Sequence, residues 1–337
     1  MKRDRRAKII IIVGTALLIL ACAASLCVGS YPVSLKDILL IFTGRCEETM
    51  KINVILKLRL PRLIMAVLAG VMLGVSGGVF QIVFKNQLAS PDILGISSGA
   101  TAGVAVITVI GIGGIGGVVF GAFAGAMLAM AFVLILVRLT GKYRTSTYIL
   151  AGIIVSALSK AFIMLLKVMA DSENEIAAIE FWTMGSFGAV TLNKLPVVAA
   201  CVAVALIVLF LMRNEILLLG LSEEHASYMG LNTKRAQIII LTAAVLGVAA
   251  VTSRIGVIAF AGLLAPHIAY LIIRKKTGAF LPFCGITGAV MLVCADILVK
   301  GIKGFGELPV SIFTTALAAP MLVLMLIRTR RDINDQT

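Results

Sequence analysis

Long apolar stretches separated by short polar ones make up most of this chain. By length and hydropathy we place ten membrane spans, at residues 9–29, 62–84, 93–111, 115–138, 147–169, 195–213, 236–255, 258–274, 279–299 and 310–328. A helix of roughly 20 apolar residues crosses about 30 Å of hydrocarbon, and most of these stretches have about that length. The pattern therefore predicts an all-α, polytopic membrane protein with about ten transmembrane helices.

Composition excludes a soluble globular domain. Hydrophobic residues make up 60% of the chain and charged residues only 14%, and the mean hydropathy is +1.09. The net charge of +14 could indicate a nucleic-acid partner, but the basic residues occur in short clusters between apolar runs and not in aromatic-rich segments. We therefore expect lipid surroundings and no nucleic acid.

The distribution of lysine and arginine predicts the orientation in the membrane. With an even number of spans, both termini lie on one side, together with the basic clusters at residues 2–8, 138–144, 274–276 and 328–331. The positive-inside rule makes that side cytoplasmic. One segment on the opposite side, residues 30–61, breaks the pattern because it carries Lys36, Arg45, Lys51, Lys57 and Arg59. Positive charge on the outer face indicates a partner there.

The N-terminus and the cysteines suggest no processing or metal site. A basic start followed by the apolar run 9–29 is similar to a signal peptide, but the run is longer than a typical signal core and further spans follow, so we expect an uncleaved first helix. The six cysteines show no C-x-x-C spacing and lie mostly in or beside apolar runs. We expect neither disulfides, nor a metal, nor a cofactor.

Two glycine series predict close helix packing. Gly70, Gly74 and Gly78 recur every four residues, and so do the glycines at positions 113, 117, 121 and 125. Small residues at this spacing line one helix face and let a neighbouring backbone approach. No Walker A motif occurs, since Gly141-Lys142 is followed by Tyr143, so ATP hydrolysis requires another chain and this chain is not expected to be an enzyme.

A polar segment between two spans is a candidate contact for such an ATPase. Residues 220–232, GLSEEHASYMGLN, are helix-compatible and bounded by glycines. Glu224, Ala226 and Gly230 match the spacing by which importer membrane subunits insert into their ATPase. The alternative is an ordinary surface loop.

The chain resembles the FecCD-type permeases, the membrane subunits of ABC importers for iron-siderophores, haem and cobalamin. The resemblance covers nearly the whole chain and rests on an ordered set of motifs: RLPR (59–62), SGG (76–78) with Gln81, residues 86–89 with Pro91, LGISSGA (94–100), Trp182 with Gly185-Ser186, GVIAFAGLLAPH (256–267), Ala295-Asp296, and ELP (307–309) leading to Ala319-Pro320. Departures from the family pattern at Gln87, Val257, Ala259, Tyr270 and Ser311 leave the cargo open.

The resemblance implies a single permease domain over residues 1–337, folded as a cobalamin/siderophore importer-like bundle in the cell membrane. It implies a coupling segment at about 214–235, a separate ABC ATPase, an extracytoplasmic substrate-binding protein, and a second permease, either another copy or a sister chain. The expected cargo is an iron-siderophore complex, with haem or cobalamin as alternatives within the same class. A proton-coupled secondary transporter using Asp296 and Glu307 is the alternative from another class.

By position, the resemblance assigns docking of the binding protein to Arg59, Arg62 and Lys300, although these cations could instead extend to lipid head groups. It assigns ATPase coupling to Gly220, Glu223, Glu224, Ala226 and Gly230.

Ionisable residues inside spans are costly and tend to face a cavity or a partner. Lys160 and Lys167 lie on one face of the fifth span, which in the family borders the translocation path, so they are candidates for attracting anionic cargo. The alternatives are snorkelling to the membrane interface and pairing with Asp171, Glu173 or Glu175. His267 is expected at a helix start with a structural role, because only one other histidine exists.

Overall fold

The computed structural model describes residues 1–337 except 1, 171–172, 222–225, 227, 303–307 and 335–337. Within this described part every regular element is a helix. The helices are α1 (Lys2–Cys27), α2 (Leu35–Phe42), α3 (Thr49–Asn53), α4 (Leu60–Val83), α5 (Ile96–Ile110), α6 (Gly114–Thr140), α7 (Thr145–Met169), α8 (Glu173–Thr183), α9 (Leu195–Leu211), α10 (Arg213–Leu219), α12 (Thr233–Ile255), α13 (Ala261–Ile273), α14 (Phe280–Gly301) and α15 (Val310–Asn334).

The helices confirm the all-α membrane fold. Seven are long and apolar enough to cross a membrane, and three shorter apolar helices accompany them at Ile96–Ile110, Ala261–Ile273 and Val310–Val323. These ten helices occupy the ten stretches that hydropathy predicts, and most of their ends differ from the prediction by only a few residues. The exceptions are the N-terminal end of α1, the C-terminal end of α15, and the helix through α4, which begins as early as Thr49.

The segment at 30–61 differs from the loop that the sequence suggested. It contains α2, and α3 continues through a π-helical stretch, Val54–Arg59, into α4, so one continuous helix runs over Thr49–Val83. Ile55 is fully buried and packs with Val33 and Ile38 in a small cluster of its own. This apolar contact, which spacing along the chain does not reveal, explains why the helix begins before the predicted span.

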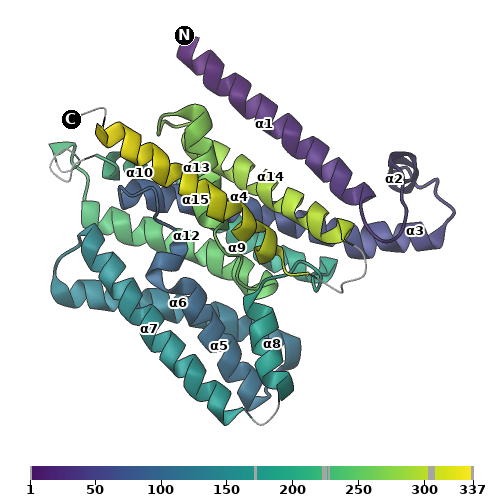
Figure 1. Ribbon diagram of the computed structural model, residues 1–337, viewed down its shortest axis with the longest axis horizontal. Coiled ribbons are helices and arrows are strands. Elements are labelled where there is room, and N and C mark those ends of the chain that lie inside the picture. Colours follow the sequence, from purple (N-terminus) through teal and green to yellow (C-terminus); the bar gives the residue numbers. More distant parts are fainter. Residues whose placement is uncertain (1, 171–172, 222–225, 227, 303–307, 335–337) are drawn as a thin grey trace.

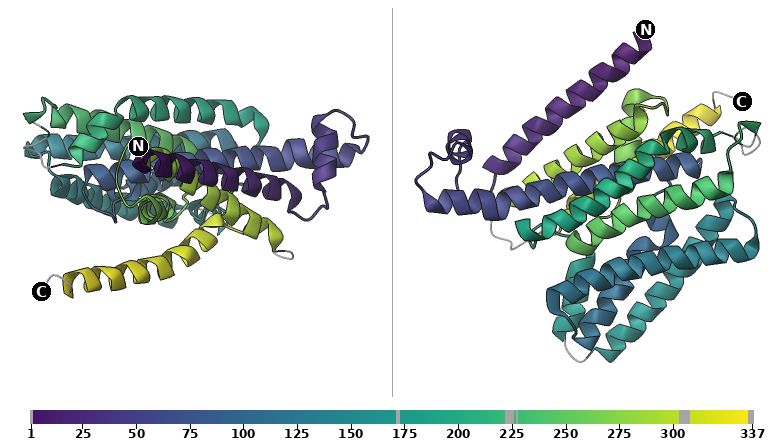
Figure 2. Two further views of the ribbon diagram at one scale, coloured as in Figure 1. Left: turned by 90° about the horizontal axis from the view of Figure 1, so that it is seen from above. Right: turned by 180° about the vertical axis from the view of Figure 1, so that it is seen from behind.

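Helix α4 lies at the centre of the bundle (Figure 1). It packs against α14, α13 and α12, while α1 lies outside along α14 and is mostly exposed (Figure 2). A second group, α5, α6, α7 and α8, covers one side of α12. An exposed apolar helix such as α1 is stable only if lipid covers it.

Close helix packing is confirmed at most of the predicted glycines, but Gly113 lies before the first turn of α6 and meets only Gly117. A Cβ at Gly74 would lie 2.1 Å from the carbonyl oxygen of Cys284, so glycine alone permits this approach of α4 to α14. A Cβ at Gly125 would lie 2.2 Å from the carbonyl oxygen of Gly99, which brings α6 against α5. The two glycine series therefore allow two close helix contacts, between α4 and α14 and between α5 and α6.

We expect Gly74→Ala to destabilise the protein by about 1–3 kcal/mol, because the added methyl group meets backbone that must move. Gly116→Ala is the matched control: nothing lies within 4 Å of its Cβ position, and alanine in an open helical site stabilises by up to about 1 kcal/mol. Thermal unfolding of the purified variants in detergent measures both. Equal unfolding temperatures for the two variants would contradict the packing role of Gly74.

Candidate functional site

The candidate site residues lie at opposite ends of the bundle. Helices α2 and α3 project at one end, which contains Arg59 and Arg62 and is called here the Arg59 end (Figure 1). Helix α10 and Gly220 lie at the other, called the Gly220 end (Figures 1 and 2).

Arg59 is buried, with only 5% of its surface exposed. Its Nη1 donates to the carbonyl oxygens of Leu26 (2.6 Å) and Cys27 (3.0 Å), and its Nη2 donates to that of Tyr31. A Cβ on Gly29 would lie 2.7 Å from Nη2, so glycine makes room for the guanidinium. Arg59 thus satisfies carbonyl groups at the end of α1, which otherwise have no partner within the helix.

Arg62 and Lys300 share one buried carboxylate. Asp296 on α14 is fully buried; its Oδ1 lies 2.5 Å from Arg62 Nε and its Oδ2 lies 2.5 Å from Lys300 Nζ. Lys300 Nζ also donates to the Ser25 hydroxyl of α1 at 3.0 Å. The structure therefore brings Arg62 and Lys300 together through Asp296, which joins α1, α4 and α14 at the Arg59 end.

The other cations of residues 30–61 divide into paired and exposed groups. Lys51 Nζ lies 2.8 Å from Glu48 Oε2 and 3.2 Å from Asp37 Oδ1. Lys36, Arg45 and Lys57 are exposed, and no ion pair to them is found among the described residues. The positive surface charge at this end comes from these three side chains more than from Arg59.

The N-terminal cap of α2 makes the stability of this helix depend on pH. The Ser34 backbone N–H and hydroxyl donate to the Asp37 carboxylate, and with Lys51 nearby they lower its pKa to about 2. Because the folded pKa lies below the ordinary value, the cap stabilises α2 at neutral pH, and this stabilisation is lost as pH falls from about 4 to about 2. Amide hydrogen exchange across α2 should accelerate over this range relative to the intrinsic rate. In an Asp37→Asn variant that acceleration should disappear; if it persists, another group is responsible.

At the Gly220 end the structure describes part of the predicted coupling segment. Gly220 follows the last residue of α10, Ala226 is helical and buried, and Gly230 has a left-handed φ of +79°. Tyr228 and Met229 are exposed by 90% and 66%. Glu223 and Glu224 lie outside the described residues. The exposure of these two side chains beside the turn at Gly230 was not predicted, because the sequence analysis of this segment considered only its charge and spacing.

The two lysines of α7 differ in their surroundings. Lys167 forms an ion pair with Glu180 of α8, a partner that the sequence analysis did not consider. Lys160 is exposed, and no ion pair to it is found among the described residues. The expected cationic strip is therefore reduced to Lys160, because Glu180 balances the charge of Lys167.

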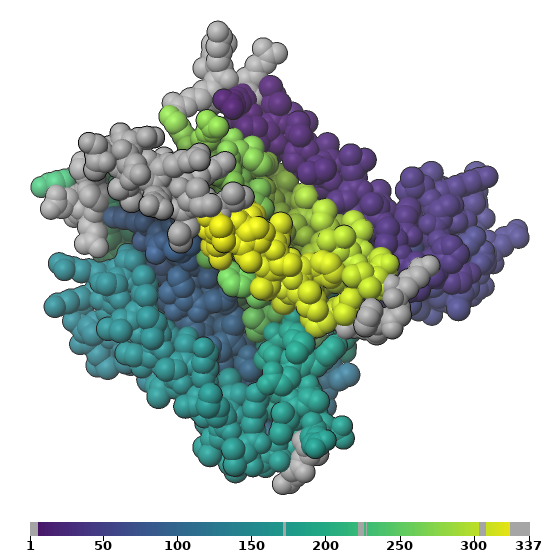
Figure 3. Space-filling model, in the orientation of Figure 1, coloured from purple at the N-terminus to yellow at the C-terminus, as the bar shows by residue number. Residues whose placement is uncertain are grey.

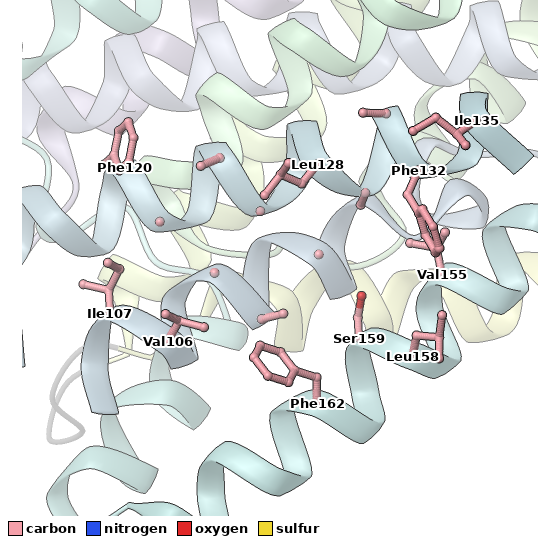
Figure 4. Close-up of a pocket in the computed structure, with 18 residues that line it drawn as sticks. Val106, Ile107, Phe120, Leu128, Phe132, Ile135, Val155, Leu158, Ser159 and Phe162 are labelled. Carbon is pink, nitrogen blue, oxygen red and sulfur yellow. The ribbon is translucent and has the colours of Figure 1, made fainter. Parts of the chain in front are cut away.

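A pocket of about 590 Å³ lies between α5, α6 and α7, and Ser159 and Phe162 of α7 contribute to its lining. Figure 4 shows Phe120, Leu128, Phe132 and Phe162 around it. Ser159 is the one hydroxyl-bearing residue in the described lining, and the lining includes neither Lys160 nor Lys167. This apolar wall suits acyl chains or a second helix better than a charged ligand.

His267 follows Pro266 within α13, and its side chain is buried. The helix begins at Ala261, so the expectation of a helix start at His267 was wrong by about two turns. Among the described residues no group of three or more His, Cys, Asp or Glu side chains could hold a metal ion.

A bundle of apolar helices, seven of them long enough to cross a membrane, is typical of a multi-pass membrane protein. The comparisons place it further: residues 17–328 match the FecCD transport family, and the chain belongs to that family. The family consists of ABC transporter permeases, which are membrane components and not enzymes.

Named relatives cover most of the chain. The hemin transport system permease protein HmuU of Yersinia pestis is 33% identical over 82% of this chain and 84% of its own. The vitamin B12 import system permease protein BtuC of Vibrio cholerae is 32% identical, covering 81% and 82%. The Fe(3+)-citrate import system permease protein YfmE of Bacillus subtilis is 29% identical, covering 96% of each.

A solved structure has the same fold. The chain superposes on an inward-facing metal-chelate type ABC transporter with a TM-score of 0.83 at 25% identity, covering 95% of this chain and 99% of the other. The family and fold support an ABC permease over the proton-coupled carrier considered from the sequence.

Proposed function

We propose that this chain is the permease subunit of an ABC importer that carries iron-siderophore complexes across the cytoplasmic membrane. The observation that carries the proposal is the family match over residues 17–328, together with relatives named for hemin, vitamin B12 and ferric citrate. Each of these three relatives is named for a metal chelate, which is too large for a narrow ion pore. Haem or cobalamin is the alternative cargo.

The two ends would serve two partners. The Arg59 end, with Arg59, Arg62 and Lys300, would receive an extracytoplasmic binding protein, and exposed Lys36, Arg45 and Lys57 would attract its acidic residues. The Gly220 end, with Gly220, Glu223, Glu224, Ala226 and Gly230, would contact the ATPase. This assignment agrees with the positive-inside rule, which places both termini on the cytoplasmic side. A second permease, identical or related, would complete the path.

Uptake into liposomes tests the proposal. The chain is reconstituted with its ATPase and binding protein and offered labelled ferric siderophores, haem and cobalamin, with and without internal ATP. ATP-dependent uptake of a ferric siderophore is the expected result. ATP-dependent uptake of haem or cobalamin alone would replace the cargo, and uptake that follows a proton gradient without ATP would overturn the importer.

We expect Lys160→Ala to slow uptake of an anionic chelate several-fold, because Lys160 is the α7 cation without an ion pair among the described residues. Lys167→Ala should have a smaller effect, since Glu180 already balances that charge. Initial uptake rates for the two single variants and the double variant measure this. A double variant with wild-type affinity and rate would remove both lysines from the translocation path.

A further inference from the structure

A groove remains open between α1 and the adjacent α13 and α14, and none of the candidate site residues discussed above lines it. It encloses about 410 Å³ and is lined almost entirely by apolar side chains. From α1 come Ile9, Val13 and Leu17, and from the facing helices come Ile272, Ile286 and Val290.

The shape of the groove follows from one close helix contact. A Cβ at Gly14 would lie 2.9 Å from Phe283 Cε2, so α1 touches α14 at this glycine. Figures 1 and 3 show α1 on the outside of the bundle, beside α14. On either side of Gly14, Val13 and Leu17 remain 61% and 53% exposed although they line the groove. The groove is therefore open along its length and is not filled by the side chains of the described residues.

A basic cluster lies at the N-terminal end of the same groove. A second hollow of about 240 Å³ is lined by Arg6, Arg274 and Lys275, and it shares Ile10 with the apolar groove. Arg274 ends α13 with a left-handed φ of +59°, and its N–H donates to the Tyr270 carbonyl at 2.7 Å. The three cationic side chains are exposed, and none forms an ion pair with a described residue.

We propose that the groove and its basic cluster form a binding site for an anionic phospholipid of the membrane. Arg6, Arg274 and Lys275 would bind the headgroup phosphate, for which arginine offers a bidentate fork. An acyl chain would lie along the apolar groove beside Gly14. Charge complementarity selects this occupant, because a transmembrane helix of a partner would not require three cations, and a soluble anion would not require the apolar groove. Basic pockets between helices on the cytoplasmic side bind anionic headgroups in this way.

Native mass spectrometry tests the site. The full chain in detergent is mixed with increasing concentrations of phosphatidylglycerol, and the number of lipid molecules bound to each protein is measured. An Arg274→Gln/Lys275→Gln variant should bind the first phosphatidylglycerol about 10- to 30-fold more weakly than the wild type, because each substitution removes roughly one favourable interaction between a basic side chain and the anionic headgroup. An Arg138→Gln/Lys142→Gln variant is the matched control, because it removes the same charge from exposed residues at the end of another helix. Wild-type protein should bind phosphatidylcholine more weakly than phosphatidylglycerol.

The apolar part has its own test. Val13→Trp changes no charge but places a large side chain in the groove, and it should weaken phosphatidylglycerol binding while the protein elutes as wild type on gel filtration. If it does not elute normally, Leu17→Trp makes the same test. Equal affinity of the wild type, the Arg274→Gln/Lys275→Gln variant and the control would overturn the site. So would displacement of the lipid by inorganic phosphate, which would indicate a site for soluble anions.

Discussion

Asp296→Asn is expected to lower the free energy of unfolding by about 3–5 kcal/mol, because it removes the buried carboxylate that Arg62 and Lys300 share. Arg62 Nε and Lys300 Nζ each lie 2.5 Å from this carboxylate, which is fully buried. Without it the two cations are left close together in an apolar bundle. Reversible unfolding of the detergent-solubilised variant, followed by circular dichroism, measures the loss.

A second substitution separates the ion pair from other effects of the change. Lys300→Met in the Asp296→Asn background restores the net charge of the cluster and should recover most of the lost stability, since a buried pair can be replaced by apolar groups at little cost. Additive losses in the double variant would contradict the coupling. Glu180→Gln is the control: it makes the same chemical change in the partly exposed pair with Lys167 and should cost no more than about 1 kcal/mol.

The spans were predictable because the signal for a membrane helix is contained in its own residues. Apolar length and glycine spacing together identify α4, and Gly74 contacts α14 as the spacing suggests. Helix α8 and the early start of α4 were not predicted. Both segments carry polar residues, Glu173 in α8 and Lys51 in α3 before α4. Buried side chains stabilise them through tertiary contacts, Ile179 in α8 and Ile55 before α4.

The sequence names residues that the structure brings together at the Arg59 end, but it does not reveal how they are arranged. The sequence analysis singled out Arg62, Lys300 and Asp296 separately, and it considered Asp296 for proton transfer and not as the shared partner of the two cations. Asp296 and Lys300 are four residues apart and therefore share a helix face, which was an available signal. The contact with Arg62, 234 positions away, needs the close packing of α4 and α14, which hydropathy does not specify.

Arg59→Met is the second change with a large expected effect, and it separates support of the fold from docking. The substitution leaves the part-buried carbonyl groups of Leu26, Cys27 and Tyr31 without the guanidinium, and a carbonyl group left unsatisfied away from water costs about 1–3 kcal/mol. We expect a total loss of several kcal/mol, measured by thermal unfolding, and hydrogen exchange that is faster at the end of α1 than elsewhere.

Lys57→Met is the matched comparison, because Lys57 lies two residues away on the same helix but is exposed. It should change stability by no more than about 0.5 kcal/mol. If the Arg59 end receives the binding protein, Lys57→Met should instead slow association at low salt, with an effect that decreases as salt screens the charge. Stopped-flow association with the binding protein that supports uptake measures this. An Arg59→Met variant as stable as wild type, but slow to associate, would assign Arg59 to docking and contradict its role as a support for the end of α1.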